Sequence, residues 1–266
     1  MFTKRLISGI ILTVLAIIVL YLGGIFLHAS MLAISLVGMY ELYRVLKIEK
    51  NALGIVGYLT AIAYYLLLWF DGPQNAMIVM IAALMILMGI YVFTFPKCKT
   101  EEVCAAFFGI FYVAVMLSYL CQVRKMADGI YLVWLVVISS WGCDTCAYCA
   151  GVTMGKHKMA PTLSPKKTVE GAVGGAVGAM LLGCLFAFVF GRYLTELGNP
   201  YLACGGACLI AALISQVGDL AASAIKRNHN IKDYGNVIPG HGGILDRFDS
   251  TLFTAPAIYF ALTFLK

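Results

Sequence analysis

The segment NAMIVMIAALMILMGIYVFTF, residues 75–95, contains no charged residue and no regular alternation of polar and apolar positions. About 20 apolar residues are enough for an α-helix to cross the roughly 30 Å hydrocarbon core of a bilayer. A helix also forms its backbone hydrogen bonds within itself, which a solvent without hydrogen-bonding groups requires. Residues 75–95 therefore predict a membrane-spanning helix.

Similar apolar windows recur along the whole chain. Its 266 residues are 62% hydrophobic with a mean hydropathy of +0.91, which is more apolar surface than a soluble core of this size buries. Because the windows are continuously apolar, they do not fit the alternating strands of a membrane barrel. We predict an all-α, polytopic integral membrane helical bundle. Its nine or so transmembrane helices are expected near residues 6–27, 29–46, 53–70, 75–95, 104–122, 129–151, 169–191, 200–225 and 248–265.

No hydrophilic linker interrupts these windows, so residues 1–266 are expected to form a single integral membrane domain. Residues 1–122 are mostly aliphatic and aromatic, and we interpret them as N-terminal spans with a structural role. His28 and Glu41 are exceptions there, interpreted as helix-end residues with access to water or headgroups. Residues 123–266 hold most of the unusual polar side chains and are expected to carry the catalytic site.

The basic residues predict the orientation in the membrane. The net charge is +6, and cytoplasmic loops are generally enriched in Lys and Arg. With nine spans, one side of the membrane receives nearly all of the basic residues, and the other receives only Arg124, Lys125, Arg192 and Lys266. The N-terminus and the 156–168 and 226–247 loops are therefore expected on the cytoplasmic side, and the C-terminus on the opposite side. The short N-terminus and compact length favour a bacterial plasma membrane.

The apolar run after Lys4 and Arg5 raises the alternative of a secretory signal. That run is long enough to span, and no clear small-x-small cleavage site follows it. We interpret it as a retained first helix.

Three motifs are explained by structure alone. Cys143, Cys146 and Cys149 have the spacing of iron-sulfur ligands but lack the fourth cysteine and its proline. The segment GVTMGKHK, residues 151–158, lacks the glycine and Ser/Thr that a phosphate-binding P-loop needs. The run GAVGGAVGAM, residues 171–180, has small residues four apart, which permits close helix packing in lipid.

Two carboxylates fall inside predicted spans. Asp144 lies in SSWGCDTCAYCAG and Asp219 in LISQVGDLAASAIKR. A charged side chain at the bilayer centre costs about 3 kcal/mol on insertion scales, so an acid retained there generally has a function. The alternative is a packing acid paired with a buried base.

Further polar residues gather between residues 219 and 249. On a helix, Asp219, Ser223 and Lys226 stand at i, i+4 and i+7 and share one face. Asp246 and Asp249 share another face if the last span begins near them. Magnesium typically binds one or two protein carboxylates and completes its shell with water and phosphate oxygens. Carboxylates from two helices with bases beside them therefore predict a magnesium site that also holds phosphates.

Two loops offer groups for anions. NVIPGHGG, residues 236–243, can bring backbone N–H groups close to a phosphate because several positions lack a side chain. KHKMAPTLSPKKTVEG, residues 156–171, places Ser164, Lys166, Lys167 and Thr168 at the expected start of a helix, where phosphate is favoured. The alternative is that these basic loops only touch anionic lipid.

One string joins these features, Ser223-x-Ile225-Lys226-Arg227-x4-Lys232-Asp233-x-Gly235-x2-Ile238-Pro239-x-His241-Gly242-Gly243-Ile244-x-Asp246-Arg247-Phe248-Asp249. It resembles, without departure, the signature of phosphatidate cytidylyltransferases, also called CDP-diacylglycerol synthases. SPKKTVEG at 164–171 and GDLAAS at 218–223 are also similar to that family, whereas the first 120 residues match only in being apolar.

The resemblance implies an enzyme, a nucleotidyltransferase of phospholipid biosynthesis. It implies that CTP and phosphatidate react to give CDP-diacylglycerol and pyrophosphate, with Mg²⁺ as cofactor, either alone or with a second metal ion. The expected partners are CTP, phosphatidate and the surrounding membrane lipids, with no nucleic acid, and the chain is expected to form a homodimer.

The resemblance also suggests roles for individual residues. Asp219 and Asp246 are expected to hold the metal, with Asp249 as a further ligand or a partner of one. Asp144 either joins the carboxylates around the metal or pairs with a buried lysine. The residues expected to contact substrate or to orient a group that does are Ser164, Lys167, Ser223, Lys226, Arg227, Lys232, His241, Gly242, Gly243 and Arg247.

Two other classes of membrane protein remain as alternatives. A cation or proton transporter also uses paired intramembrane acids, but it gives no reason for the glycine-histidine loop and the lysines. Another lipid-phosphate enzyme, such as a CDP-alcohol phosphotransferase or a polyprenol kinase, is the second. The characteristic Asp-Gly motif of the phosphotransferases is absent, because the only Asp-Gly pairs, at 71 and 128, lack the rest of it.

Overall fold

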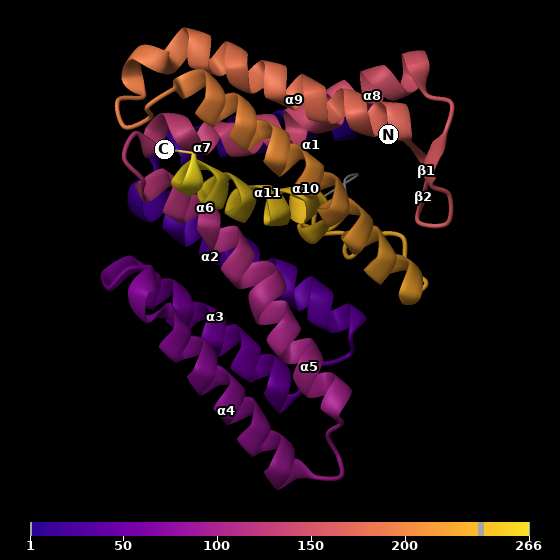
Figure 1. The fold of residues 1–266 in the computed structure, drawn as a ribbon. Helices are drawn as coiled ribbons and strands as arrows, with labels where there is room; N and C mark the ends of the chain where they lie inside the picture. Colours follow the sequence, from indigo (N-terminus) through magenta and orange to yellow (C-terminus); the bar gives the residue numbers. More distant parts are fainter. Residues whose placement is uncertain (1, 239–241, 266) are drawn as a thin grey trace. The chain divides into compact units, whose positions relative to one another are not determined.

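The computed structural model describes residues 2–238 and 242–265, with side chains from residue 9 onward. Helices dominate the described residues, which confirms the predicted all-α class (Figure 1). They are α1 (Phe2–Leu22), α2 (Gly24–Val45), α3 (Ala52–Phe70), α4 (Ala76–Thr94), α5 (Thr100–Gly109), α6 (Met116–Lys125), α7 (Gly129–Val137), α8 (Cys143–Met154), α9 (Val169–Phe190), α10 (Pro200–Asn228) and α11 (Leu245–Phe264).

Two pairs of these helices form continuous spans. A π-helical stretch at Ile110–Val115 joins α5 to α6, and another at Ile138–Gly142 joins α7 to α8. Such π-helical turns within α-helices frequently lie at functional sites. The second one ends at Gly142, two residues before Asp144. Counting each joined pair once gives nine helical segments in the described chain, as predicted.

Seven of the nine segments, within the described residues, are long and apolar enough to cross a membrane. Of α1, the residues with described side chains, Gly9–Leu22, form a shorter apolar helix. The other segment outside the seven is α11, whose first two turns carry Asp246, Arg247 and Asp249. A multi-pass membrane bundle is therefore the architecture of this chain.

Helix ends follow local sequence signals. Asn51 caps α3 by accepting a hydrogen bond from the Gly54 N–H at 2.9 Å. Thr168 caps α9 in the same way, accepting from the Gly171 N–H at 3.1 Å. The break between the first two spans was predicted near residue 28 but lies at Gly23, whose φ of 61° is in the left-handed region that favours glycine.

The chain forms two compact units, and the first consists of Met1–Ser118 and Asp233–Asp246. Its helices α3, α4 and α5 pack side by side (Figure 1). Tyr43 of α2 is fully buried there and donates a hydrogen bond to the Ala106 carbonyl at 2.6 Å. A Cβ added at Gly57 would lie 2.3 Å from the Tyr43 hydroxyl, and one added at Gly109 would lie 2.2 Å from the Tyr43 ring. Both positions therefore require glycine.

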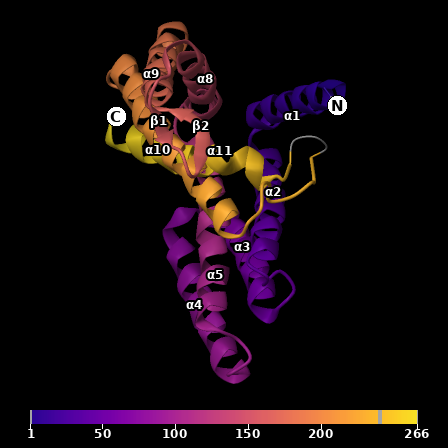
Figure 2. The same cartoon turned by 90° about the vertical axis from the view of Figure 1, so that its right-hand side faces the viewer.

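The second unit consists of Tyr119–Lys232 and Arg247–Lys266. Helix α9 packs against both α8 and α10 (Figures 1 and 2). A Cβ added at Gly174 would lie 2.3 Å from the Cβ of Ala150, and one at Gly178 would lie 2.5 Å from the Cβ of Cys146. The glycine run therefore lets α8 and α9 approach closely, as its spacing predicts.

A small β-hairpin precedes α9 (Figure 2). Strand β1 (Lys158–Ala160) pairs antiparallel with β2 (Ser164–Thr168). The expectation that Ser164, Lys166 and Lys167 stand at the start of a helix is therefore wrong, because they lie in β2 and only Thr168 caps the helix. Pro165 within the strand cannot donate a helical hydrogen bond, and the hairpin satisfies this backbone instead.

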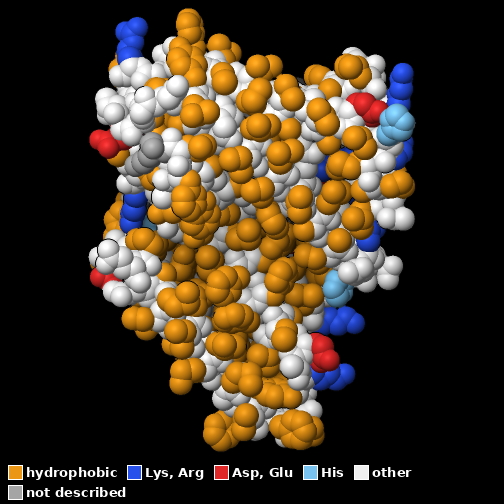
Figure 3. Space-filling view, in the orientation of Figure 1, with side chains coloured by type: hydrophobic (Ala, Val, Ile, Leu, Met, Phe, Trp, Pro, Cys, Tyr) orange, Lys and Arg blue, Asp and Glu red, His pale blue; other side chains and the backbone are white. Residues whose placement is uncertain are grey.

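Large apolar side chains cover much of the outer surface (Figure 3). In α4, Met85 is 70% exposed and Ile78 is 63% exposed, and most of the helix faces outward. Water would disfavour so much exposed apolar surface, whereas hydrocarbon accepts it. This surface fits the lipid-facing side of a membrane protein.

Candidate active site

An ion pair in the second unit joins two of the predicted site residues. Asp219, Ser223 and Lys226 lie in α10, each partly exposed, at the helical spacing that the sequence predicts. Lys167 extends from β2, and its ammonium forms an ion pair with Oδ2 of Asp219. The two side chains are 26% and 30% exposed, so the pair is shielded from water but open to a ligand.

Two further carboxylates lie close to this pair. Asp144 of α8 lies within electrostatic range of both Asp219 and Lys167. Asp249 of α11 lies within electrostatic range of Asp219, Asp144 and Lys226. The second unit thus gathers three acids and two lysines from four separate elements, and we call Asp144, Asp219, Asp249, Lys167 and Lys226 the charged cluster. The two lysines offset part of the repulsion among the three acids.

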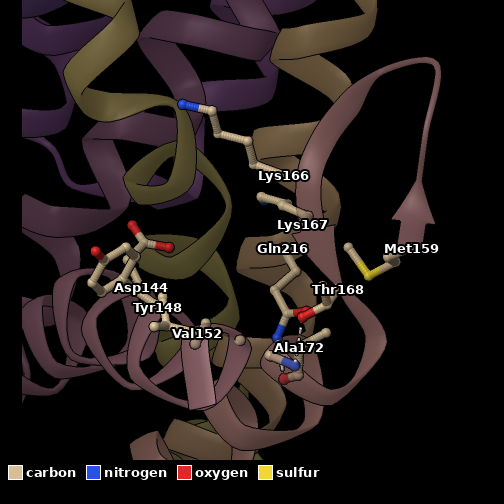
Figure 4. Close-up of a pocket in the computed structure, with 12 residues that line it drawn as sticks. Asp144, Tyr148, Val152, Met159, Lys166, Lys167, Thr168, Ala172 and Gln216 are labelled. Atoms are coloured by element: carbon tan, nitrogen blue, oxygen red, sulfur yellow. Dashed lines mark hydrogen bonds between the residues drawn. The ribbon is translucent and has the colours of Figure 1, made fainter. Parts of the chain in front are cut away.

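A cavity of about 380 Å³ lies beside the cluster. Asp144 and Tyr148 of α8 line one wall, and Lys166 and Lys167 of β2 line another (Figure 4). Such a volume lies in the range that small-molecule sites occupy. The cavity thus offers a carboxylate and basic groups to one ligand, which is the pattern of a metal-phosphate site.

Gln216 of α10 also lines this cavity, and it was not among the predicted site residues. Its amide donates to the carbonyl of Ala172 at 2.9 Å, which holds α10 to α9 at the base of the cavity (Figure 4). Gln216 lies one turn before Asp219, so a polar residue at i−3 from the intramembrane acid was the available signal.

Glu170 fixes the hairpin that carries Lys167. Its carboxylate accepts the backbone N–H groups of Lys156 at 3.0 Å and His157 at 3.1 Å, and it contacts His157 Nδ1 at 2.6 Å. These bonds tie the beginning of the hairpin to the first turn of α9. Glu170 and His157 were not among the predicted site residues, although an acid in the first turn of a helix is a recognised signal.

The described residues of the signature loop, 233–238 and 242–245, belong to the first unit. Asp246 is 8% exposed, and its Oδ2 accepts the backbone N–H groups of Tyr234 at 2.8 Å and Gly243 at 3.0 Å. Gly242 has a φ of 85°, which requires glycine, and the Ile238 N–H donates to its carbonyl at 3.0 Å. Asp246 thus holds the loop in place, and its role as a metal ligand stays a prediction.

The remaining predicted contact residues are placed as follows. Arg227, Lys232 and Arg247 are exposed, Ser164 is partly exposed at the start of β2, and Gly243 of the loop is buried. His241 lies outside the described residues, together with Pro239 and Gly240 of the same loop.

One interpretation of the N-terminal spans is wrong. His28 and Glu41 lie near the two ends of α2, but they are only 5% and 1% exposed, so neither has the predicted access to water. His28 Nε2 instead lies 2.7 Å from the carbonyl of Tyr65. Hydropathy places such residues in a span, but it does not say which neighbour will satisfy them.

The carboxylates fit a metal ion that substrate helps to bind. In the described part of the chain, no three His, Cys, Asp or Glu side chains converge closely enough to hold an ion by themselves. Magnesium differs from zinc here, because it needs only one or two carboxylates when phosphate oxygens and water fill its other positions. Asp219 and its acidic neighbours satisfy that requirement.

Proteins of similar sequence identify the family of this chain. The model of the cytidylyltransferase family matches residues 3–265. The phosphatidate cytidylyltransferase of Bacillus subtilis is 32% identical, covering 97% of each chain, and that of Staphylococcus saprophyticus is 30% identical, covering 96% of each. A Staphylococcus aureus protein of the same name is 28% identical, again over 96% of each chain. The chain therefore belongs to the cytidylyltransferase family and is a nucleotidyltransferase.

Proposed function

We propose that this protein transfers the cytidylyl group of CTP to phosphatidate, giving CDP-diacylglycerol and pyrophosphate. The ion pair between Lys167 and Asp219 at the cavity is the structural observation that carries the proposal, because it combines an acid for a metal with a base for a phosphate. The relatives named phosphatidate cytidylyltransferase, similar over nearly the whole chain, support the choice of substrates.

The reaction needs little proton chemistry. An ionised phosphate oxygen of phosphatidate attacks the α-phosphorus of CTP and forms the new P–O bond. The bond from that phosphorus to the bridging oxygen of the β-phosphate breaks, and pyrophosphate leaves with the electron pair. Because the attacking oxygen already carries negative charge, the protein mainly has to align two polyanions and offset their repulsion.

The residues of the charged cluster divide these tasks. Lys167 and Lys226 bind phosphate oxygens, and the ammonium of Lys167 exchanges Asp219 for phosphate when substrate enters. Asp219, with Asp249 and Asp144 beside it, would hold Mg²⁺, and we propose that one or two ions bind. Bound Mg²⁺ would neutralise charge on the phosphates.

The lipid substrate imposes a second requirement, since its acyl chains remain in hydrocarbon while its headgroup meets a water-soluble nucleotide. Three apolar side chains of α8 near the cavity are largely exposed: Tyr148 at 72%, Val152 at 68% and Met154 at 67%. We propose that the acyl chains lie along this face of α8. The headgroup then reaches Asp144 and Lys167 without leaving the membrane boundary.

The cellular setting follows from the same proposal. A multi-pass protein with bacterial relatives fits phospholipid biosynthesis in a bacterial plasma membrane, with the N-terminus and the cavity on the cytoplasmic side, where CTP is available. We further propose a homodimer.

One assay tests the reaction. Purified protein in phosphatidate-containing vesicles is supplied with labelled CTP, with and without Mg²⁺, and the lipid and pyrophosphate products are counted. We expect equal amounts of CDP-diacylglycerol and pyrophosphate, formed only when the metal is present. Ion flux across the same vesicles without CTP, in the absence of any lipid product, would instead favour a transporter.

A further inference from the structure

Helix α2 reaches the signature loop through a buried acid. Glu41 lies one turn before the end of α2 and is 1% exposed. Its Oε1 accepts the backbone N–H of Ile244 at 3.0 Å, and its Oε2 accepts that of Leu245 at 2.8 Å. Both oxygens therefore accept hydrogen bonds from the backbone where the loop meets α11, more than 200 residues away along the chain.

Two glycines of the signature accommodate this carboxylate. A Cβ added at Gly235 would lie 2.3 Å from Oε1 of Glu41, and one at Gly243 would lie 2.6 Å from both oxygens. Real Cβ atoms do not approach oxygen so closely, so neither position tolerates a larger residue while Glu41 stays in place. The loop is thus shaped around the Glu41 side chain.

Arg44, on the next turn of α2, holds the other end of the loop. Its guanidinium donates to the carbonyl of Tyr234 at 2.6 Å, while the N–H of Tyr234 donates to Asp246. Two residues of α2 therefore fix the two ends of one loop, and Arg44 also offsets part of the buried charge of Glu41.

A simple helix cap does not explain this arrangement. The first N–H groups of a helix are ordinarily satisfied by a Ser, Thr, Asp or Asn directly before it. In α11 a buried acid from a distant helix takes that role, although a buried charge is retained at a cost unless hydrogen bonds and opposite charge offset it.

We infer that Glu41 is a positioning residue for the reaction: it fixes the signature loop and the start of α11, and with them the carboxylate of Asp246. It acts on backbone N–H groups and does not itself touch substrate. This inference rests on the proposed function, because it assumes that the signature loop takes part in turnover.

The test compares Glu41→Gln with Glu41→Asp and with Glu49→Gln as a matched control. Gln keeps the size of the side chain but turns an amide NH₂ toward one of the two N–H donors, whereas Asp keeps both acceptors on a shorter stem. Glu49 is an acid beyond the end of α2 for which no contact with the loop is seen among the described residues.

Amide hydrogen exchange across residues 233–245 is measured together with kcat and KM for CTP. Losing a hydrogen bond to a charged group corresponds to a change of about 10- to 100-fold. We expect Glu41→Gln to exchange that much faster at Ile244 and Leu245 and to lose kcat by a similar factor. Glu41→Asp should recover part of both, and Glu49→Gln should match the wild type.

Unchanged exchange in Glu41→Gln, or wild-type kcat despite faster exchange, would overturn the inference. If Glu41→Gln does not fold, Arg44→Lys takes its place, because the loss of the guanidinium should loosen the loop at Tyr234 and lower kcat. The two claims can fail separately. If the wild type makes no lipid product but the Glu41 variants still exchange faster, the proposed function is refuted and the anchoring of the loop by Glu41 is supported.

Discussion

Asp219 lies within the apolar helix α10, and its carboxylate pairs with Lys167 of strand β2. The ammonium of Lys167 compensates its charge when no other cation is bound, so the acid can remain in α10 at a tolerable cost. The same pairing keeps Lys167 at the cavity where a phosphate would enter. The two residues thus stabilise each other and prepare the site.

Replacement of Asp219 by Asn should remove the proposed metal ligand and leave Lys167 without its partner. We expect kcat to fall roughly 100-fold or more, with the protein still inserted in the membrane. Steady-state rates of CDP-diacylglycerol formation in vesicles measure this. Asp71→Asn, at an exposed acid at the end of α3, is the control and should keep normal turnover. Normal turnover in Asp219→Asn would refute the assignment.

At the scale of elements, the hairpin β1–β2 presents Lys166 and Lys167 to the cavity. Its position depends on Glu170, which accepts N–H groups from Lys156 and His157. The lysines themselves stand out in the sequence, but the strand that directs them does not, because so short a hairpin has no hydrophobic period.

Glu170→Gln should loosen the hairpin, since a neutral amide accepts hydrogen bonds more weakly than a carboxylate. The KM for CTP should rise about 10-fold, and kcat should change less, because the lysines remain present but are held less firmly. Glu101→Gln, at an exposed acid in the first turn of α5, serves as the matched control. Equal KM values for the two variants would contradict this role.

The contact between α8 and α9 makes a separate prediction about stability. Gly178→Ala places a methyl group 2.5 Å from the Cβ of Cys146, which should lower the free energy of unfolding by about 1–3 kcal/mol. Gly89→Ala in α4 meets nothing within 4 Å and should be neutral or slightly stabilising. Thermal unfolding of both variants in detergent distinguishes them, and equal melting temperatures would contradict the tight helix contact.

At the scale of the whole molecule, the exposed apolar surface and the basic loops together predict how the protein lies in a membrane. The 156–168 loop has four basic residues, Lys156, Lys158, Lys166 and Lys167. The loop before α10 has one basic residue, Arg192. Because cytoplasmic loops collect Lys and Arg, these two loops should lie on opposite sides of the membrane.

Short epitope tags inserted at Thr162 and at Gly198 test this orientation. Thr162 is exposed in the hairpin turn, and Gly198 meets nothing within 4 Å, so both sites should accept an insertion. In intact cells, antibody should reach the tag at Gly198 but not the tag at Thr162. Labelling of both tags, or of Thr162 alone, would contradict the predicted orientation.

The sequence by itself determined the membrane architecture and the chemical class of the site. Lipid acts as a uniform apolar solvent, so the position of most spans follows from hydropathy alone; the third, predicted at 53–70, is the helix Ala52–Phe70. The charged residues of the signature were equally visible, because acids retained in or beside apolar helices need a reason.

Only the tertiary structure decided which of those residues meet. It paired Asp219 with Lys167, placed Asp144 and Asp249 beside them, and buried Glu41 under a loop that begins almost 200 residues later. Helical spacing relates residues within one helix, but contacts between helices depend on side-chain packing and on which backbone groups remain unsatisfied. Those conditions are fixed only when the whole chain has folded.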